Sequence, residues 1–235
     1  MKKLGLWNDG PGIGDKLQFG AVPENYFRNF GEKVVDMSNC WVFDHNPYVV
    51  RGEQAQHHLN LWLVQFPAED YLSYGERQTI KFGWPKCYLR HPRLYKYEDA
   101  KTNLGTVVVH TNGKSEGGVM SDETIAQIQK NYDGYRIIQI GGTNDRNTPF
   151  EKALGLSMWN SAELIATSQV FIGVNSSMMN IANCYPRVHR KVVINRTDVE
   201  KYYPISVMSS WIDYNWTYIN QSEEDLGVTY SYKKI

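Results

Sequence analysis

Runs of β-branched and other apolar residues alternate with helix-type patterns along much of the second half of the chain. These runs lie at Thr106–His110, Arg136–Ile140, Gln169–Val174 and Lys191–Asn195. Short continuous apolar runs are typical of strands buried on both faces. Their alternation with helices predicts parallel strands joined by helical crossovers. The expected fold class is therefore α/β, with a parallel sheet in this half.

The first 40 residues open with the same alternation. Residues 3–8 predict a strand, and the glycine-rich segment DGPGIGD, residues 9–15, predicts a loop after it. A helix is expected to start near Asp15. Pro23 is expected to bend or split that helix, because proline lacks the amide donor that a helix interior needs. Residues 33–37 predict a second strand, which completes the opening of a parallel α/β unit.

Three further helices are expected from weaker signals. One is expected around His57–Phe66, inside a stretch whose periodicity is otherwise weak. Ser121 is expected to cap a second helix, because two acidic residues follow it where the helix dipole favours negative charge. Asn160 is expected to cap a third helix, with Glu163 completing an approximate capping box.

The charge balance and the cysteines narrow the class of protein. The 235 residues carry 25 basic and 25 acidic side chains, so the net charge is zero. Proteins that bind duplex DNA usually carry more basic than acidic side chains. Cys40, Cys87 and Cys184 are far apart and odd in number, which indicates neither a disulfide framework nor a CxxC metal pair. With no signal-peptide pattern and no apolar run of about 20 residues, we expect a cytoplasmic protein without a membrane span.

The glycine-rich loop at residues 10–15 is the first candidate site. Glycines between a strand and a helix let backbone N–H groups approach a ligand. The loop is not a Walker motif, because no GK[ST] follows, and it lacks the third glycine of the dinucleotide pattern. Asp15 stands at the mouth of the helix. Its carboxylate is either a helix cap or a general base that takes a proton from an acceptor hydroxyl.

Small polar segments follow three of the strands in the second half. They are HTNGK at 110–114, GGTND at 141–145 and VNSS at 174–177. Because the carboxyl ends of parallel strands share one edge, we expect the three segments to lie together where open α/β sheets bind ligands. Each segment has two interpretations. The VNSS segment holds a phosphate or caps a helix, Lys114 neutralises a phosphate or is a solvated surface lysine, and GGTND cradles a nucleoside or forms a tight turn.

Other catalytic patterns are missing from the sequence. No HxxxH or HExxH spacing occurs, so no metal site is expected. No GxSxG motif occurs either, which disfavours a serine hydrolase.

The order of the segments resembles the heptosyltransferase-like glycosyltransferases of family 9. Members of that family open with a strand and a GD-containing loop entering a helix, matched here by GPGIGDKLQFGAVPENYF. The phrase FDHNPYV at 43–49 is similar to a later segment of the same lobe. The second-lobe matches are VVVHTNGK, IIQIGGTND, WNSAELIATSQ and FIGVNSSMMNIAN, the last being similar to the family pattern FIGxDSGxxHxA. The resemblance covers most of residues 3–195 and is strongest at 12–17 and 159–184.

The resemblance implies a GT-B fold, in which two Rossmann-like lobes with parallel sheets face each other across a cleft. The expected lobes are residues 1–102 on the acceptor side and residues 103–205 on the nucleotide-sugar side. A tail at residues 206–235 is expected to pack back on the first lobe.

The resemblance also implies site residues. Asp15 matches the aspartate proposed as catalytic base, and Lys114 matches a lysine that binds the donor phosphate. The acceptor-side loop contributes Gly12, Gly14 and Lys16. The expected donor-binding residues are Thr111, Asn112, Lys114, Gly141, Gly142, Glu163, Asn175, Ser176, Ser177 and Asn180.

Three positions depart from the family pattern. The family's Asp is Asn175 here, its Gly is Ser177 and its His is Asn180. These changes remove a charge and a titratable group from the expected donor site, so ADP-heptose cannot be assumed to be the donor.

The implied activity is metal-independent transfer of a sugar from a nucleotide-diphosphate sugar to an acceptor hydroxyl, with inversion and with no cofactor besides the donor. The acceptor is open and includes a glycan, a lipid-linked sugar or a modified DNA base. Two alternatives remain. A glycosyltransferase acting on a modified base in viral DNA requires a basic groove beside Asp15. A catalytically inactive nucleotide- or sugar-binding protein is favoured by the loss of the family's Asp and His.

Overall fold

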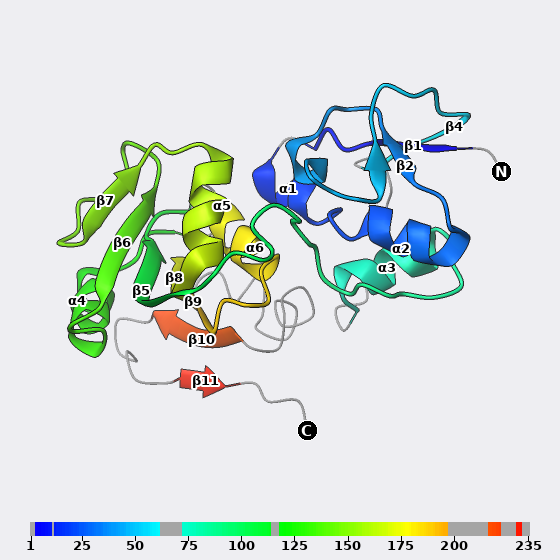
Figure 1. The fold of residues 1–235 in the computed structure, drawn as a ribbon. Coiled ribbons are helices and arrows are strands. Elements are labelled where there is room, and N and C mark those ends of the chain that lie inside the picture. Colours follow the sequence, from blue (N-terminus) through cyan, green and yellow to red (C-terminus); the bar gives the residue numbers. More distant parts are fainter. Residues whose placement is uncertain are drawn as a thin grey trace. The chain divides into compact units, whose positions relative to one another are not determined.

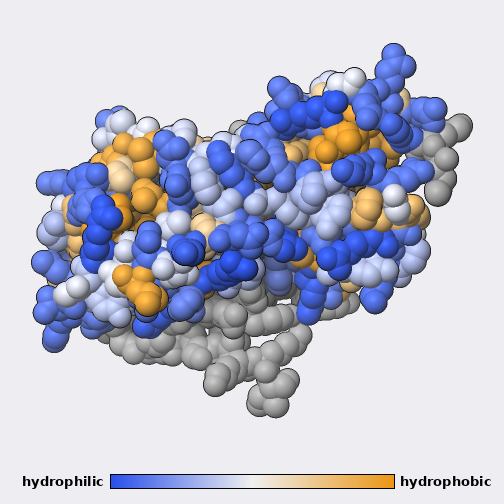
Figure 2. All heavy atoms as spheres, in the orientation of Figure 1, coloured by the Kyte–Doolittle hydropathy of each residue, from blue (hydrophilic) through white to orange (hydrophobic). Residues whose placement is uncertain are grey.

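The computed structural model describes residues 3–10, 12–61, 72–113, 118–196, 216–221 and 229–231. The chain divides into two compact units. The first contains the described residues up to Lys96, and the second contains those from Tyr97 onward. Each unit has its own β-sheet with helices packed against it, so each is an α/β structure (Figure 1). Hydrophilic residues cover most of the face seen in Figure 2, and apolar residues form small separate patches on it.

In the part of the first unit that the structure describes, the sheet has four parallel strands in the order β3-β2-β1-β4. Leu6, Val34 and Val35 are buried in it. Because β1 is an inner strand, the glycine-rich loop that follows it leaves from the inner part of the sheet's carboxyl edge. The elements of this unit are β1 (Leu4–Trp7), α1 (Ile13–Leu17), α2 (Val22–Phe30), β2 (Val34–Asp36), the 3-10 turn η1 (Trp41–Phe43), β3 (Val49–Val50), β4 (His57–Asn60) and α3 (Tyr74–Lys81).

The helix predicted after the glycine-rich loop is split, as expected from Pro23. α1 ends at Leu17 and α2 begins at Val22, so that Pro23 falls in the first turn of α2, where no amide donor is required. α2 ends at Gly31, whose left-handed backbone (φ 73°) lets its N–H donate to the carbonyl of Phe27.

The helix predicted around His57–Phe66 is wrong for its first part. His57–Asn60 forms β4, an edge strand that pairs in parallel with β1 from Leu4↔His57 to Trp7↔Asn60. Backbone pairing with β1 overrides the weak local pattern, because the preference of a short segment for a strand depends on its neighbours. The remaining residues of the prediction, from 62 onward, lie outside the described ones.

Within the described residues, the sheet of the second unit has seven strands in the order β11-β10-β9-β8-β5-β6-β7, and all neighbouring pairs are parallel except β10 with β11. The four predicted strands are present, whereas β7, β10 and β11 were not predicted. The elements of this unit are β5 (Asn103–His110), α4 (Asp122–Asn131), β6 (Arg136–Gly141), β7 (Glu151–Leu154), α5 (Met158–Thr167), β8 (Ser168–Val174), α6 (Ser177–Asn183), β9 (Arg190–Arg196), β10 (Trp216–Gln221) and β11 (Thr229–Ser231).

Two helix starts test the capping predictions. Ser121 caps α4 as predicted, since its Oγ accepts the N–H of Thr124 at 3.1 Å. The cap predicted at Asn160 is wrong. α5 begins at Met158 and is capped by Ser157, whose Oγ accepts the N–H of Asn160. A serine side chain competes with asparagine for this role, and Ser157 is the residue with extended backbone.

The described residues of the tail belong to the second sheet. β10 pairs in parallel with β9, and β11 pairs with β10. The predicted packing of the tail against the first lobe therefore concerns only the tail residues outside β10 and β11, and for those it stays a prediction. Among the helices that the structure describes, none is both long and apolar enough to cross a membrane.

Candidate functional site

The carboxyl ends of three neighbouring strands in the second unit form one candidate site. β8, β5 and β6 are adjacent and parallel, so the segments after Val174, His110 and Gly141 leave from one edge of the sheet. Open α/β sheets bind their ligands at this edge. The three segments singled out in the sequence are therefore neighbours in space.

His110, the last residue of β5, connects these segments. Its Nδ1 lies 2.9 Å from the Oγ of Ser176, just before α6. Its Nε2 lies 3.9 Å from Oδ2 of Asp145, in the loop after β6. Because β5 lies between β8 and β6, a side chain at its end reaches the loops on both sides. The imidazole thus lies within hydrogen-bond distance of Ser176 at one neighbouring strand end and beside Asp145 at the other.

The imidazole of His110 is neutral at pH 7. Burial lowers the pKa of His110 to about 4, against an ordinary value of 6.5, because the charged form loses its hydration. A neutral ring has one donor and one acceptor nitrogen. His110 is therefore suited to orienting the Ser176 hydroxyl rather than to supplying positive charge to a phosphate.

The low pKa of His110 predicts a specific loss of stability in mild acid. Between pH 6.5 and about pH 4 the unfolded chain binds a proton at this position and the folded chain does not, so stability falls as the pH falls. From pH 7 to pH 5 the wild type should lose about 2 kcal/mol more unfolding free energy than a His110→Gln variant. Urea unfolding at the two pH values measures this, because the other histidines contribute to both proteins. Equal losses would contradict a buried, neutral His110.

A buried hydrogen-bond network joins the loop after β5 to the loop after β6. The Nε2 of Gln139, which is fully buried, donates to Thr111 Oγ1 at 3.0 Å and to the carbonyl of Arg146 at 2.8 Å. Lys152 Nζ donates to Gln139 Oε1 at 2.6 Å. The backbone N–H of Arg146 donates to Asn112 Oδ1 at 3.4 Å. Thr111 and Asn112 therefore help to hold the loop after β6 against the end of β5.

Gly141 is required by the geometry of this loop. Its φ of +143° is a conformation that side chains rarely adopt, and a Cβ here would lie 2.0 Å from Oδ2 of Asp145 and 3.2 Å from Cδ2 of His110. Gly142 is exposed, and a Cβ there would lie 3.1 Å from Oδ1 of Asp145. A side chain at Gly141 would displace the Asp145 carboxylate.

The other residues predicted to bind the donor lie at the start of α6, within α6 and on α5. Asn175, Ser176 and Ser177 are half-buried at the junction of β8 and α6. Asn180 lies one turn into α6, and its Nδ2 donates to the carbonyl of Ser176 at 3.4 Å. Glu163 is exposed on α5, where its carbonyl accepts from Thr167 Oγ1. Lys114 lies outside the described residues, so its role as a phosphate ligand stays a prediction.

The glycine-rich loop of the first unit is a second candidate site. α1 begins at Ile13 rather than at Asp15, and Asp15 Oδ2 accepts the N–H of Gly12 at 2.9 Å. A Cβ at Gly12 would lie 2.6 Å from that same oxygen. The capping interpretation of Asp15 is therefore correct. A carboxylate has about four acceptor positions on two oxygens, so this bond leaves capacity to accept a proton.

Residues after β1 and β2 hold this loop in place. Asn8 Nδ2 donates to the carbonyl of Lys16 at 2.9 Å, and the N–H of Asn8 donates to Ser38 Oγ at 2.9 Å. Ser38 Oγ in turn donates to Asp36 Oδ1 at 3.1 Å, and Arg51 Nε donates to Asp36 Oδ2 at 2.9 Å. Lys16 itself is half-buried in α1, and Gly14 is half-buried one residue before Asp15. These supports connect the ends of the parallel strands of the first sheet.

Sequence reasoning did not select His110, Asp145 and Gln139 as site residues. His110 and Asp145 lie within the segments that were singled out, so their positions at strand ends were the available signal. Gln139 has no such signal, because a glutamine inside the run RIIQI resembles an ordinary interruption of an apolar strand. Only the pairing of β5 with β6 brings Gln139 to Thr111. Within the described parts of the chain, no three His, Cys, Asp or Glu residues are grouped so that they could hold a metal ion.

Two α/β units with parallel sheets, each placing a polar loop at its carboxyl edge, define an α/β protein of the GT-B type, and solved structures bear this out. One similar structure is the family 9 glycosyltransferase of Veillonella parvula, at TM-score 0.70 and 7% identity over 94% of this chain and 86% of that one. A second is ADP-heptose lipopolysaccharide heptosyltransferase II of Escherichia coli, at TM-score 0.62 and 12% identity over 96% and 92%. The resemblance inferred from the sequence is thus confirmed at the level of the fold.

A third similar structure is the iron-containing dodecameric glycosyltransferase TibC from enterotoxigenic E. coli. It matches at TM-score 0.61 and 15% identity over 83% of this chain, which spans 58% of the length of the TibC chain. Comparison with protein-family models and with curated proteins gives no match.

Proposed function

We propose that this protein is a glycosyltransferase that moves a sugar from a nucleotide-diphosphate sugar to an acceptor hydroxyl, independently of metal and with inversion. The observation that carries the proposal is the meeting of three strand ends at His110, with Ser176 on one side and Asp145 on the other. The similarity of fold to glycosyltransferases supports it. Two further similar structures are described as complexes, one of TibC with ADP-D-β-D-heptose and one of the E. coli heptosyltransferase WaaC with ADP.

In the proposed reaction, the Asp15 carboxylate removes the proton from the acceptor hydroxyl. The hydroxyl oxygen then forms a bond to the anomeric carbon while the bond from that carbon to the diphosphate oxygen breaks. The electron pair leaves with the nucleoside diphosphate. Lys114 and the polar groups at Ser176 and Ser177 are proposed to stabilise the negative charge that develops on this leaving group. The acceptor side comprises Gly12, Gly14 and Lys16.

The proposed donor site predicts stabilisation by one class of nucleotide. A nucleoside diphosphate at a hundredfold excess over its Kd stabilises the folded state by about 2.7 kcal/mol, which is a rise in Tm of about 5–10 °C for a chain of this size. A thermal-shift screen of nucleoside diphosphates and nucleotide sugars measures this. The matching nucleotide sugar should then release its diphosphate when an acceptor hydroxyl is supplied.

The outcomes of this screen separate the possible functions. A shift that comes with no release or transfer from any nucleotide sugar would favour a catalytically inactive nucleotide-binding protein. The absence of a shift with every nucleotide and nucleotide sugar would contradict the donor site itself.

A further inference from the structure

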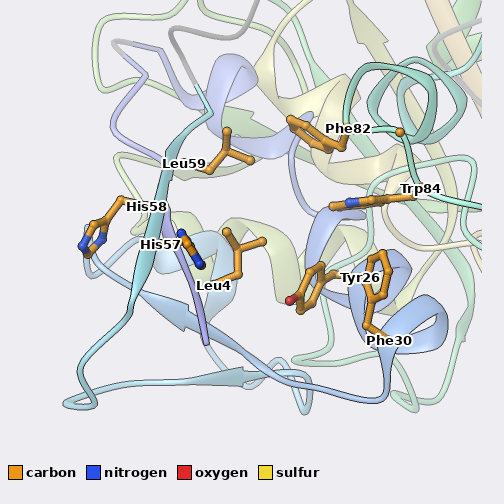
Figure 3. Close-up of a pocket in the computed structure, with 9 residues that line it drawn as sticks. Leu4, Tyr26, Phe30, His57, His58, Leu59, Phe82 and Trp84 are labelled. Carbon is orange, nitrogen blue, oxygen red and sulfur yellow. The ribbon is translucent and has the colours of Figure 1, made fainter. Parts of the chain in front are cut away.

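The first unit contains a pocket that the proposed reaction does not use. It lies on one face of the four-stranded sheet, between the amino-terminal ends of β1 and β4 on one side and α2 with the turn after α3 on the other (Figure 3). Its volume is about 510 Å³, within the range of small-molecule sites. The lining residues are Leu4, Tyr26, Phe30, His57, His58, Leu59, Phe82, Gly83 and Trp84.

The pocket and the glycine-rich loop are formed by different residues of the first unit. A strand advances about 3.3 Å per residue, so Leu4 lies roughly 10 Å from the end of β1 where the loop begins, and Leu59, in register with Leu6, lies nearer to that end. None of the lining residues named above belongs to the glycine-rich loop, so the pocket is distinct from the site proposed for the acceptor.

Four aromatic rings form one wall of this pocket. The ring centroids of Tyr26 and Phe30 are 4.9 Å apart, those of Tyr26 and Trp84 are 5.8 Å apart, and those of Phe82 and Trp84 are 4.9 Å apart. All three pairs are tilted or edge-on, which is the arrangement that aromatic quadrupoles favour. Because each ring is held by another, the wall is formed before any ligand enters.

The end of α3 fixes the position of Trp84. Gly83 has a left-handed backbone (φ 65°), its N–H donates to the carbonyl of Ile80, and the N–H of Trp84 donates to the carbonyl of Thr79 at 2.9 Å. These two bonds form a Schellman motif, a rigid way to end a helix. The indole is thereby turned toward Tyr26 and the strands, as Figure 3 shows.

The opposite wall is provided by the strands. Leu4 and His57 are paired in the parallel register of β1 and β4, and Leu59 lies two residues after His57. Residues two apart in a strand share one face, so all three can face the rings. In Figure 3 the imidazole of His57 points toward the hollow, and that of His58 points away from the rings.

The lining selects for one class of ligand. Among the residues that the structure describes, the lining contains no Asp, Glu, Lys or Arg. A charged group would therefore lose its hydration there without a partner. Most of the described lining is hydrocarbon, and the side-chain polar groups on the side of the rings are the His57 imidazole, the Tyr26 hydroxyl and the Trp84 indole nitrogen. A sugar ring carries more hydroxyls than these groups can satisfy, whereas a flat aromatic ring with one polar atom matches them.

We propose that this pocket is a second binding site, which takes an uncharged, flat ring compound of one or two fused rings with a single hydrogen-bonding group. The ligand packs against Trp84 and Phe82 and uses its polar atom toward His57. The site belongs to the first unit alone and does not depend on the proposed transferase activity.

Indole is the probe that tests this site, with saturation-transfer NMR on the full chain as the measurement. We expect binding with a Kd on the order of 1 mM, as for a fragment of this size.

Trp84→Ala should weaken binding at least tenfold. His57→Trp, a change at an exposed position that fills the hollow with a larger ring, should do the same and serves if Trp84→Ala does not fold. His57→Ala removes the hydrogen-bonding partner without filling the hollow, so it should weaken binding less than His57→Trp does. Tyr135→Ala removes an exposed ring in the other unit and is the control, which should bind indole as the wild type does.

Each other result overturns part of the proposal. No transfer of saturation to indole at about 10 mM, ten times the expected Kd, would remove the site. Equal binding by the wild type and His57→Trp would place indole elsewhere. Indole-3-acetate binding as well as indole would contradict the requirement for an uncharged ligand. A methyl glucoside that binds more tightly than indole would make the site a sugar site.

Discussion

An Asp15→Asn variant is expected to lose sugar transfer by a factor of about 10²–10⁴, which is the usual contribution of a general base. Asparagine keeps the local structure, because its Oδ1 can still accept the N–H of Gly12 that Asp15 accepts at 2.9 Å. The amide cannot take a proton from the acceptor hydroxyl. Initial rates of diphosphate release with a saturating acceptor measure the loss, and the thermal shift produced by the nucleotide should be unchanged.

Asp9→Asn is the matched control for this variant. Asp9 is an exposed aspartate before the same glycine-rich loop, so its substitution removes the same charge at a nearby position. Wild-type turnover is expected there. Wild-type turnover in Asp15→Asn would instead remove Asp15 from the base role and leave it as the cap of α1.

A Gly141→Ala variant is expected to bind its nucleotide at least tenfold more weakly, a change of about 1.4 kcal/mol or more. The new Cβ would lie 2.0 Å from Asp145 Oδ2, so the carboxylate must move from its place beside His110, and we expect the loop after β6 to shift with it. Isothermal titration with the nucleoside diphosphate that gives the largest thermal shift measures the effect.

Gly134→Ala separates this steric effect from backbone strain. Gly134 also has a positive φ (+80°), and nothing lies within 4 Å of the Cβ that alanine would add. Left-handed backbone costs a non-glycine residue about 1–2 kcal/mol, so both variants should lose stability. Only Gly141→Ala should also lose affinity. Equal nucleotide affinity in the two variants would mean that the loop after β6 takes no part in binding.

The strands of the second unit could be predicted from the sequence because their signal is local. Thr106–His110 and Gln169–Val174 are buried on both faces, and such strands need continuous apolar residues. β7 (Glu151–Leu154) could not be predicted, since the segment EKAL has no strand-like composition. Pairing with β6 at the edge of the sheet makes it a strand. The same cause turned the segment at His57 into a strand rather than a helix.

The candidate site likewise has features that could be predicted from the sequence and features that could not. Glycines, small polar residues and their position after strands indicated the loops at residues 10–15 and 141–145. The partners within those loops could not be predicted. His110 meets Ser176 across 66 positions of the chain, and no pattern near either residue indicates the other. The low pKa of His110 likewise depends on burial by residues from several elements.

By itself, the sequence determined the α/β class, the polar loops after the strands, the cap of α4 at Ser121 and the split of the first helix at Pro23, because these depend on a few adjacent residues. Only the tertiary structure decided the strand order, the meeting of three strand ends at His110 and the aromatic wall around Trp84. Those features depend on contacts between residues that are distant in the chain, and the geometry of such contacts is set by the packing of the whole unit.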